Sequence, residues 1–240
     1  MKRLVATSAV LVWVASGCGS APDDTVTILA ASSLADVMPQ VIAVAERERP
    51  DEAFEVSYAA SSQIVQQLNA GIDADAAVLA GQGPLASLDP SVAAGTPAVV
   101  ATNTLAIALA DGNPGRVTSL ADLGNNDITL VLCAEQVPCG AAAAQMFHQT
   151  GINPTIASLE PDVRATLSKV VSGEADAGVV YVTDLVGQSV GHLDVRAEDQ
   201  VVTTYPALSI DDSRSGADFV DLLSSDTAQK VLRDAGFGAP

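Results

Sequence analysis

The chain has 240 residues, of which 48% are hydrophobic and only 3% aromatic, and its formal net charge is −18 at pH 7. This charge argues against nucleic acid as a partner, because phosphate binding needs clustered Lys and Arg, and against attachment to anionic lipid through a basic patch. It does not exclude a small anionic ligand, because local hydrogen-bond donors can outweigh a distant field, and it favours solubility.

Residues 1–18 have the pattern of a secretory signal. A short basic start is followed by an almost wholly apolar run over residues 4–14, and small residues then lead into Cys18. An apolar run of this length is too short to cross a hydrocarbon core of roughly 30 Å, so the pattern predicts an export signal and not a membrane span.

The Ser-Gly-Cys sequence that ends at Cys18 resembles the bacterial lipoprotein processing site, in which the Cys becomes the lipidated first residue of the mature protein. It predicts an extracytoplasmic or periplasmic protein with a lipid anchor on Cys18 in the outer face of the cell membrane, followed by a polar tether over residues 19–24. The alternative is an ordinary cleaved signal in which Cys18 is incidental.

Strand and helix patterns alternate along the mature chain. The first section predicts a strand at residues 25–30, a helix at 34–49, a strand at 54–58, a helix at 63–70, a strand at 76–80, then a loop with a short helix and a strand at 98–101. The second predicts a strand at 105–110, a short helix at 120–124, a strand at 128–133, helices at 140–150 and 162–172, and a strand at 177–181. The third predicts strands within 201–210 and closing helices at 218–223 and 227–234.

This alternation predicts an α/β fold in which mostly parallel sheets are covered by helices. A single sheet could hold every strand. The break in pattern near Asn103 and its return near Tyr205 suit two lobes instead, joined by two crossovers. We expect residues 25–103 with 205–240 to form the first lobe and residues 104–204 to form the second.

Three cysteines occur in the sequence. If Cys18 carries lipid, Cys133 and Cys139 remain as an even pair in an oxidising compartment, where a disulfide is the default. Free thiols, or a metal or redox pair, are the alternatives. The two histidines, His148 and His192, are not at metal-ligand spacing from another ligand. We expect neither a metal site nor a cofactor.

Small neutral donors recur where strands give way to helices. They occur at residues 32–33 (Ser-Ser), 61–62 (Ser-Ser), 138–140 (Pro-Cys-Gly) and 162–164 (Asp-Val-Arg). A helix N-terminus presents unpaired N–H groups and can hold an anion without a formal charge, and α/β sheets place ligands outside the carboxyl ends of their strands. Several such ends would form a cage of neutral donors, although each serine alone could be only a helix cap.

Five segments in this order carry a family resemblance: residues 30–34, 59–62, 137–140, 162–164 and 179–181. Together they resemble the molybdate-binding proteins of bacterial ABC transporters, across essentially the whole mature chain. The resemblance implies a type II binding-protein fold with a ligand cleft between two lobes. It also implies molybdate or tungstate as the ligand, with partner permease and ATPase subunits. We expect the protein to be a monomer.

The resemblance implies five ligand positions: Ser33, Ser61, Cys139, Val163 and Tyr181. The serines and the tyrosine would donate hydroxyl groups, and the other two would donate backbone N–H groups. Ser32 and Ser62 are neighbours of this set. A cage of donors suits a fully deprotonated dianion, whereas the proton of a phosphate would stay unpaired at a cost of roughly 1–3 kcal/mol. A disulfide at Cys139 would stiffen the loop that carries its donor.

Two other functions remain open. The fold serves many ligands, so sulfate, phosphate or an organic anion is the first alternative. A serine-dependent hydrolase using Ser33 or Ser61 is a remote one, because neither His148 nor His192 lies in a segment predicted to reach these serines, and no Gly-x-Ser-x-Gly elbow is present. We therefore expect a binding protein and not an enzyme.

Overall fold

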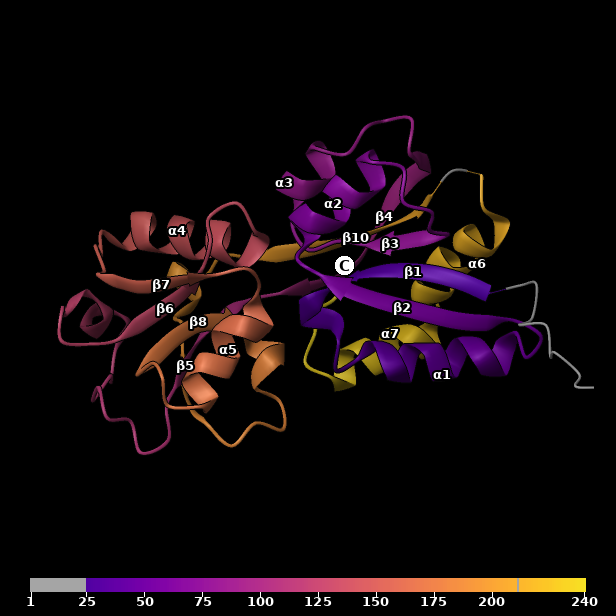
Figure 1. Cartoon of the computed structure of the whole chain (residues 1–240). Helices are drawn as coiled ribbons and strands as arrows, with labels where there is room; N and C mark the ends of the chain where they lie inside the picture. Colours follow the sequence, from indigo (N-terminus) through magenta and orange to yellow (C-terminus); the bar gives the residue numbers. More distant parts are fainter. Residues whose placement is uncertain (1–24, 211) are drawn as a thin grey trace, which may run out of the picture.

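Two five-stranded sheets organise the chain (Figure 1). The computed structural model describes residues 25–210 and 212–240, so the predicted signal, Cys18 and the tether lie outside the described residues. The strand order is β2-β1-β3-β10-β4 in the first sheet and β7-β6-β8-β5-β9 in the second. Helices flank both sheets, which confirms the predicted α/β fold with two lobes.

The first lobe is built on the first sheet. Its strands are β1 (Thr25–Ala31), β2 (Ala53–Ala59), β3 (Ala76–Val78), β4 (Ala93–Asn103) and β10 (Thr203–Ile210). Its helices are the 3-10 turn η1 (Ser32–Leu34), α1 (Met38–Glu48), α2 (Ser61–Asn69), α3 (Gln82–Ala86), α6 (Arg214–Leu223) and α7 (Asp226–Asp234). Side chains alternate along β1, so Ile28 packs under α1, α6 and α7 while Leu29 packs under α2 and α3 on the other face.

The second lobe is built on the second sheet. Its strands are β5 (Leu105–Leu109), β6 (Leu130–Cys133), β7 (Ile156–Glu160), β8 (Ala177–Tyr181) and β9 (Gly191–Asp194). Its helices are α4 (Pro138–Thr150), α5 (Val163–Val171) and the 3-10 turns η2 (Leu120–Gly124), η3 (Val182–Leu185) and η4 (Ala197–Asp199). β5 and β8 are buried along their whole length in one apolar core, which explains their continuous hydrophobic runs.

The lobes are connected where β4 runs into β5 and where the chain returns into β10. At this junction the side-chain amide of Asn103 donates to the hydroxyl of Thr183 at 2.7 Å and to the hydroxyl of Tyr205 at 3.3 Å. Thr183 belongs to η3 of the second lobe, whereas Asn103 and Tyr205 lie on the crossover strands. These buried hydrogen bonds fix the two lobes to each other at the hinge.

The structure differs from the sequence prediction in strand direction and at two edges. β1 pairs in parallel with β2 and β3, but β10 is antiparallel to β3 and β4, and β5 is antiparallel to β8 and β9. Both sheets are therefore mixed and not mostly parallel, because the crossover strands enter from the opposite lobe. The edge strands β7 and β9 were not predicted.

Helix starts differ as well. The helix predicted at residues 34–49 divides into η1 and α1, since Pro39 is favoured only in the first turn of a helix. The helix predicted at 218–223 begins earlier, at Arg214, because the side chain of Ser213 caps it. Within the described ranges, no helix is long and apolar enough to cross a membrane. In the same ranges, no group of three or more His, Cys, Asp or Glu side chains could hold a metal ion.

Candidate ligand-binding site between the lobes

A small cavity lies where the two lobes meet. It is lined by Ala31, Ser32, Ser33, Ala60, Ser61, Ala80, Pro138, Cys139, Asp162, Val163 and Tyr181. The cavity leaves about 10 Å³ for the centre of a water-sized molecule, which is about the space that a single water needs. In Figure 1, β1 and β2 run toward the second lobe, and their carboxyl ends therefore face this space.

All five predicted ligand residues line the cavity, and so does Ser32. Ser62 does not line it. Its side chain lines a separate hollow between α2 and the start of α4. The two adjacent serines of α2 therefore have different surroundings, because successive residues on a helix point in different directions.

Three helices begin at the cavity. Ser61 is the first residue of α2, Val163 is the first of α5, and Cys139 lies in the first turn of α4. The first N–H groups of a helix have no acceptor within the helix, and the helix dipole makes this end partly positive. The carboxylate of Asp162 accepts the N–H of Ala165 and thereby caps α5. The cavity is thus surrounded by positive helix ends without a Lys or Arg among its lining residues.

The hydroxyl groups at the cavity are oriented by their neighbours. The oxygen of Ser61 accepts the N–H of Ala80 at 2.8 Å, and the oxygen of Tyr181 accepts the hydroxyl of Thr203 at 3.4 Å. Each oxygen accepts a hydrogen bond here, so each hydroxyl keeps its own proton to donate to another acceptor. Burial raises the pKa of Tyr181 far above its usual value, so this side chain stays a neutral donor.

Ser33 takes part in a longer hydrogen-bond chain. Its hydroxyl lies 2.8 Å from the hydroxyl of Tyr205, which also accepts from Asn103. If Tyr205 donates its proton to Ser33, the proton of Ser33 is left for the cavity. Tyr205 is fully buried, and burial raises its pKa well above the usual value. The predicted ligand Ser33 is thus held by residues from the crossover strands.

The loop before α4 is held tightly. Cys133 and Cys139 are joined in a disulfide, with their Cα atoms 5.7 Å apart. A Cβ at Gly140 would meet the carbonyl oxygen of Ala134 at 2.0 Å, so the first turn of α4 can pack this closely only with glycine at that position. The disulfide and this close packing hold the first turn of α4, which carries the cavity residue Cys139, against the end of β6.

Charged residues lie near the cavity, and their pairing is not visible in the local sequence pattern. Asp36 precedes α1 and pairs with Arg164 at 2.6 Å. The carboxylate of Asp184 is buried, and one of its oxygens has no hydrogen-bond partner. Burial raises the pKa of Asp184 to about 7. The sequence does not indicate the pairing of Asp36 with Arg164, because the two residues are 128 positions apart.

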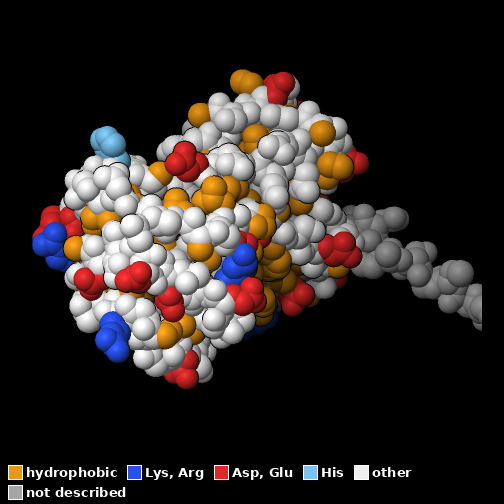
Figure 2. All heavy atoms as spheres, turned by 60° about the vertical axis from the view of Figure 1, so that its left-hand side comes forward, with side chains coloured by type: hydrophobic (Ala, Val, Ile, Leu, Met, Phe, Trp, Pro, Cys, Tyr) orange, Lys and Arg blue, Asp and Glu red, His pale blue; other side chains and the backbone are white. Residues whose placement is uncertain are grey.

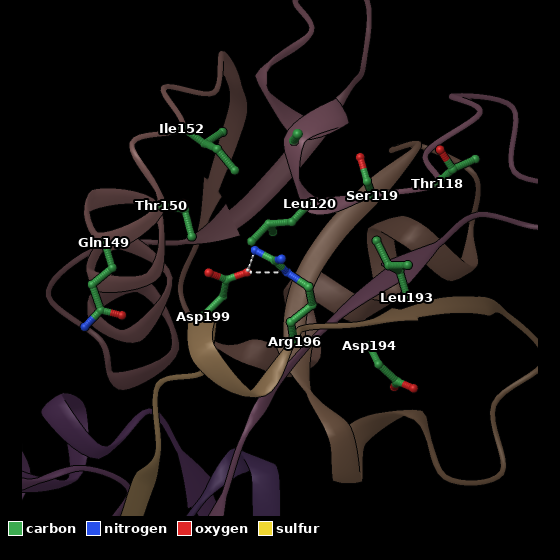
Figure 3. Close-up of a pocket in the computed structure, with 11 residues that line it drawn as sticks. Thr118, Ser119, Leu120, Gln149, Thr150, Ile152, Leu193, Asp194, Arg196 and Asp199 are labelled. Atoms are coloured by element: carbon green, nitrogen blue, oxygen red, sulfur yellow. Dashed lines mark hydrogen bonds and ion pairs between the residues drawn. The ribbon is translucent and has the colours of Figure 1, made fainter.

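A larger hollow of about 640 Å³ lies elsewhere, in the second lobe (Figure 3). Its rim carries Arg196, which pairs with Asp199 at 2.7 Å and with Glu198 at 3.0 Å. Because this guanidinium is already neutralised, the hollow has little to attract an anion. None of the predicted ligand residues lines it.

The chain matches a known protein family over almost its whole described length. The family described as "Bacterial extracellular solute-binding protein" matches residues 26–238. The chain belongs to this family. The solute-binding protein therefore acts by binding and not by catalysis, and its relatives work outside the cytoplasm, as the sequence analysis predicted.

Individual relatives resemble this solute-binding protein over most of its length. The Molybdate-binding protein ModA of Mycobacterium tuberculosis is 31% identical, over 90% of this chain and 85% of that one. The solved periplasmic molybdate-binding protein of Azotobacter vinelandii is 17% identical with a TM-score of 0.79, over 90% and 99% of the two chains. The sulfate-binding protein SubI of M. tuberculosis is 16% identical with a TM-score of 0.76, over 89% and 86%. The fold alone therefore does not choose between ligands.

Proposed function

We propose that this protein is the solute-binding component of an ABC importer and that it captures molybdate or tungstate in the cavity between its lobes. The observation that carries the proposal is the convergence of neutral donors on a space for one small ion. Ser61 and Tyr181 have their oxygens engaged and their protons available, and α2, α4 and α5 begin there.

The size of the cavity selects the class of ligand. With about 10 Å³ for the centre of a water-sized molecule, its small size favours a compact oxyanion over sugars, peptides and most organic anions. Binding needs no cofactor, because every contact comes from the protein's own hydroxyl and backbone N–H groups. Fixed donors at a fixed radius also favour one ionic size, which a flexible Lys or Arg would not.

The chemistry of the donors selects the protonation state. A fully deprotonated dianion such as molybdate, tungstate or sulfate offers only acceptors, so each can be satisfied by a donor cage. A phosphate that keeps a proton would leave that proton unpaired, at a cost of roughly 1–3 kcal/mol. The relative with 31% identity is named a molybdate-binding protein, which favours molybdate over sulfate. Sulfate is the second candidate, because a similarly folded protein is named for it.

The proposed partners follow from this role. An ABC permease and its ATPase would receive the oxyanion when the lobes open. A lipid on Cys18 would keep the protein, as a monomer, near the permease, with residues 19–24 as the tether. Treatment of the full-length protein in cells with a signal-peptidase II inhibitor would test the anchor. Accumulation of the uncleaved precursor supports it, and normal processing contradicts it.

A thermal-shift series with molybdate, tungstate, sulfate and phosphate would test the proposed ligand. A ligand that binds only the folded state stabilises it by about 2.7 kcal/mol at one hundred times its Kd. We expect large, equal shifts with molybdate and tungstate and a small shift with sulfate. A larger shift with sulfate or phosphate would change the ligand but keep the transport role, and no shift with any of them would refute oxyanion binding.

A further inference from the structure

A cluster of three charges spans the two lobes beside the cavity. Asp36 lies in the first lobe, between η1 and α1, while Arg164 on α5 and Asp184 on η3 belong to the second. The guanidinium of Arg164 donates to the two carboxylate oxygens of Asp36 at 2.6 and 3.3 Å. A third distance, 3.9 Å, separates Arg164 from the buried oxygen of Asp184.

We propose that Arg164 is a positioning residue whose ion pair with Asp36 latches the lobes closed over a bound oxyanion and slows its release. The inference rests on the proposed function, because it supposes a small anion in the cavity. Arg164 follows Val163, whose backbone lines the cavity. A bond from Arg164 to the first lobe therefore holds the first turn of α5 against the serine side of the cavity.

The geometry makes this pair dependent on closure. Asp36 and Arg164 come from different lobes, so separation of the lobes about the hinge breaks their contact and leaves the bonds within each lobe intact. Their side chains are 53% and 35% exposed. Water therefore competes for both groups once they part, and salt weakens their attraction.

The buried carboxylate of Asp184 gives Arg164 a second interaction, within its own lobe. Its Oδ2 accepts the N–H of Tyr181, a cavity residue, while its Oδ1 is buried without a hydrogen bond. Arg164 is the cation that faces this carboxylate, and Asp36 and Asp162 add further negative charge around it. Arg164 thus has two separable roles, because it offsets the charge of Asp184 within its own lobe and bonds Asp36 across the cleft.

The first experiment measures release of radiolabelled molybdate into excess unlabelled molybdate, using Asp36→Asn and Asp73→Asn. Asp73 is an exposed carboxylate of the same lobe outside the cluster, so the control makes the same change in charge. We expect Asp36→Asn to release the ion about two- to fivefold faster at low salt, with wild-type stability of the ligand-free protein. The difference should vanish near 1 M salt, where the screening length is about 3 Å.

Equal release rates for Asp36→Asn and Asp73→Asn would overturn the latch. If the wild-type protein retains no labelled molybdate, the proposed ligand is wrong, and the same pair of variants is compared with labelled sulfate. The failure of the ligand assignment and the failure of the latch are therefore seen separately.

A second experiment separates the two roles of Arg164. Arg164→Gln should release molybdate faster and also unfold at a lower temperature, because it leaves Asp184 without its cation. Adding Asp184→Asn should restore the unfolding temperature but not the slow release, and Arg164→Lys should recover part of the slow release. If Arg164→Gln/Asp184→Asn restores slow release as well, Arg164 acts only within its own lobe and the latch is refuted.

Discussion

The side-chain oxygen of Ser61 accepts the backbone N–H of Ala80 at 2.8 Å, from the end of the neighbouring strand. This bond determines the hydrogen-bonding role of the Ser61 hydroxyl. With one lone pair engaged, the O–H group is left to donate into the cavity that both residues line. The same serine thus joins two segments of the first lobe and, in the proposed function, would offer its proton to the ligand.

Substitution of Ser61 tests this arrangement. We predict that Ser61→Ala lowers oxyanion affinity about 10- to 100-fold, since a hydrogen bond to a charged group contributes about 1.5–3 kcal/mol. Ser62→Ala is the matched control, because Ser62 is the next residue on the same helix but lines another hollow. Titration calorimetry of both variants checks the prediction, and similar losses in the two would contradict it.

Tyr181 supplies the second prediction. Tyr181→Phe removes the phenolic proton while keeping the buried ring, so we expect affinity to fall at least about tenfold with little change of fold. In the wild-type protein, burial holds the pKa of Tyr181 far above its usual value. Loss of the tyrosine proton therefore should not weaken binding between pH 7 and pH 10. If the affinity of the wild-type protein falls through this range and that of Tyr181→Phe does not, the tyrosine ionises and the prediction is wrong.

Asp184 supplies a pH dependence of stability. Its pKa is raised to about 7 in the folded protein, from an ordinary value of 3.8. Between these values the folded state binds more protons than the unfolded state, so this group makes the protein less stable as the pH rises from 4 to 7. The groups that share its surroundings are Arg164, Tyr181, Asp36 and Asp162.

We predict that Asp184→Asn removes this penalty. The amide oxygen can still accept the N–H of Tyr181, and no buried charge remains. The free energy of unfolding, measured by urea denaturation, should therefore rise relative to wild type by up to about 4 kcal/mol at pH 8 and change little at pH 4. A variant that is destabilised equally at both pH values would show that Asp184 acts through packing alone.

The disulfide between Cys133 and Cys139 supplies the fourth prediction. Reduction should lower stability by roughly 2 kcal/mol, as expected for a short closed loop. It should also weaken oxyanion binding, because the loop that presents the N–H of Cys139 must then be ordered on binding. Calorimetry with and without reductant checks both effects, with Cys133→Ser/Cys139→Ser as the reductant-insensitive control. Equal affinity in oxidised and reduced protein would remove the preorganising role.

The sequence predicted the inner elements and the cavity residues well, for a local reason. Buried strands such as β5 and β8 are continuous apolar runs, and each predicted ligand lies close to a strand end or a helix start. Because strands of one sheet end at a common edge, residues such as Ser33 and Ser61 lie together even though they are far apart in the chain.

Other features depend on contacts between distant parts of the chain, which no local sequence pattern indicates. β7 and β9 are edge strands with exposed, partly polar residues, so they lack the apolar alternation that predicts a strand. The contact between Ser33 and Tyr205 joins residues 172 positions apart. Strand direction at β10 depends on how the chain crosses between lobes, and the bond of Arg164 to Asp36 depends on how the lobes close.

The surface is consistent with the overall acidity. Figure 2 shows acidic side chains scattered over one face, with few basic ones among them. An anion is therefore not drawn to this face by a general field, and its capture must depend on short-range donors at the cavity.

The most direct measurement is calorimetric titration of residues 19–240 with molybdate and, separately, with sulfate. We predict one site per chain, with molybdate bound at least about a hundredfold more tightly than sulfate, which corresponds to roughly 2.7 kcal/mol. Sulfate binding as tight as molybdate binding, or no heat from either anion, would contradict this prediction.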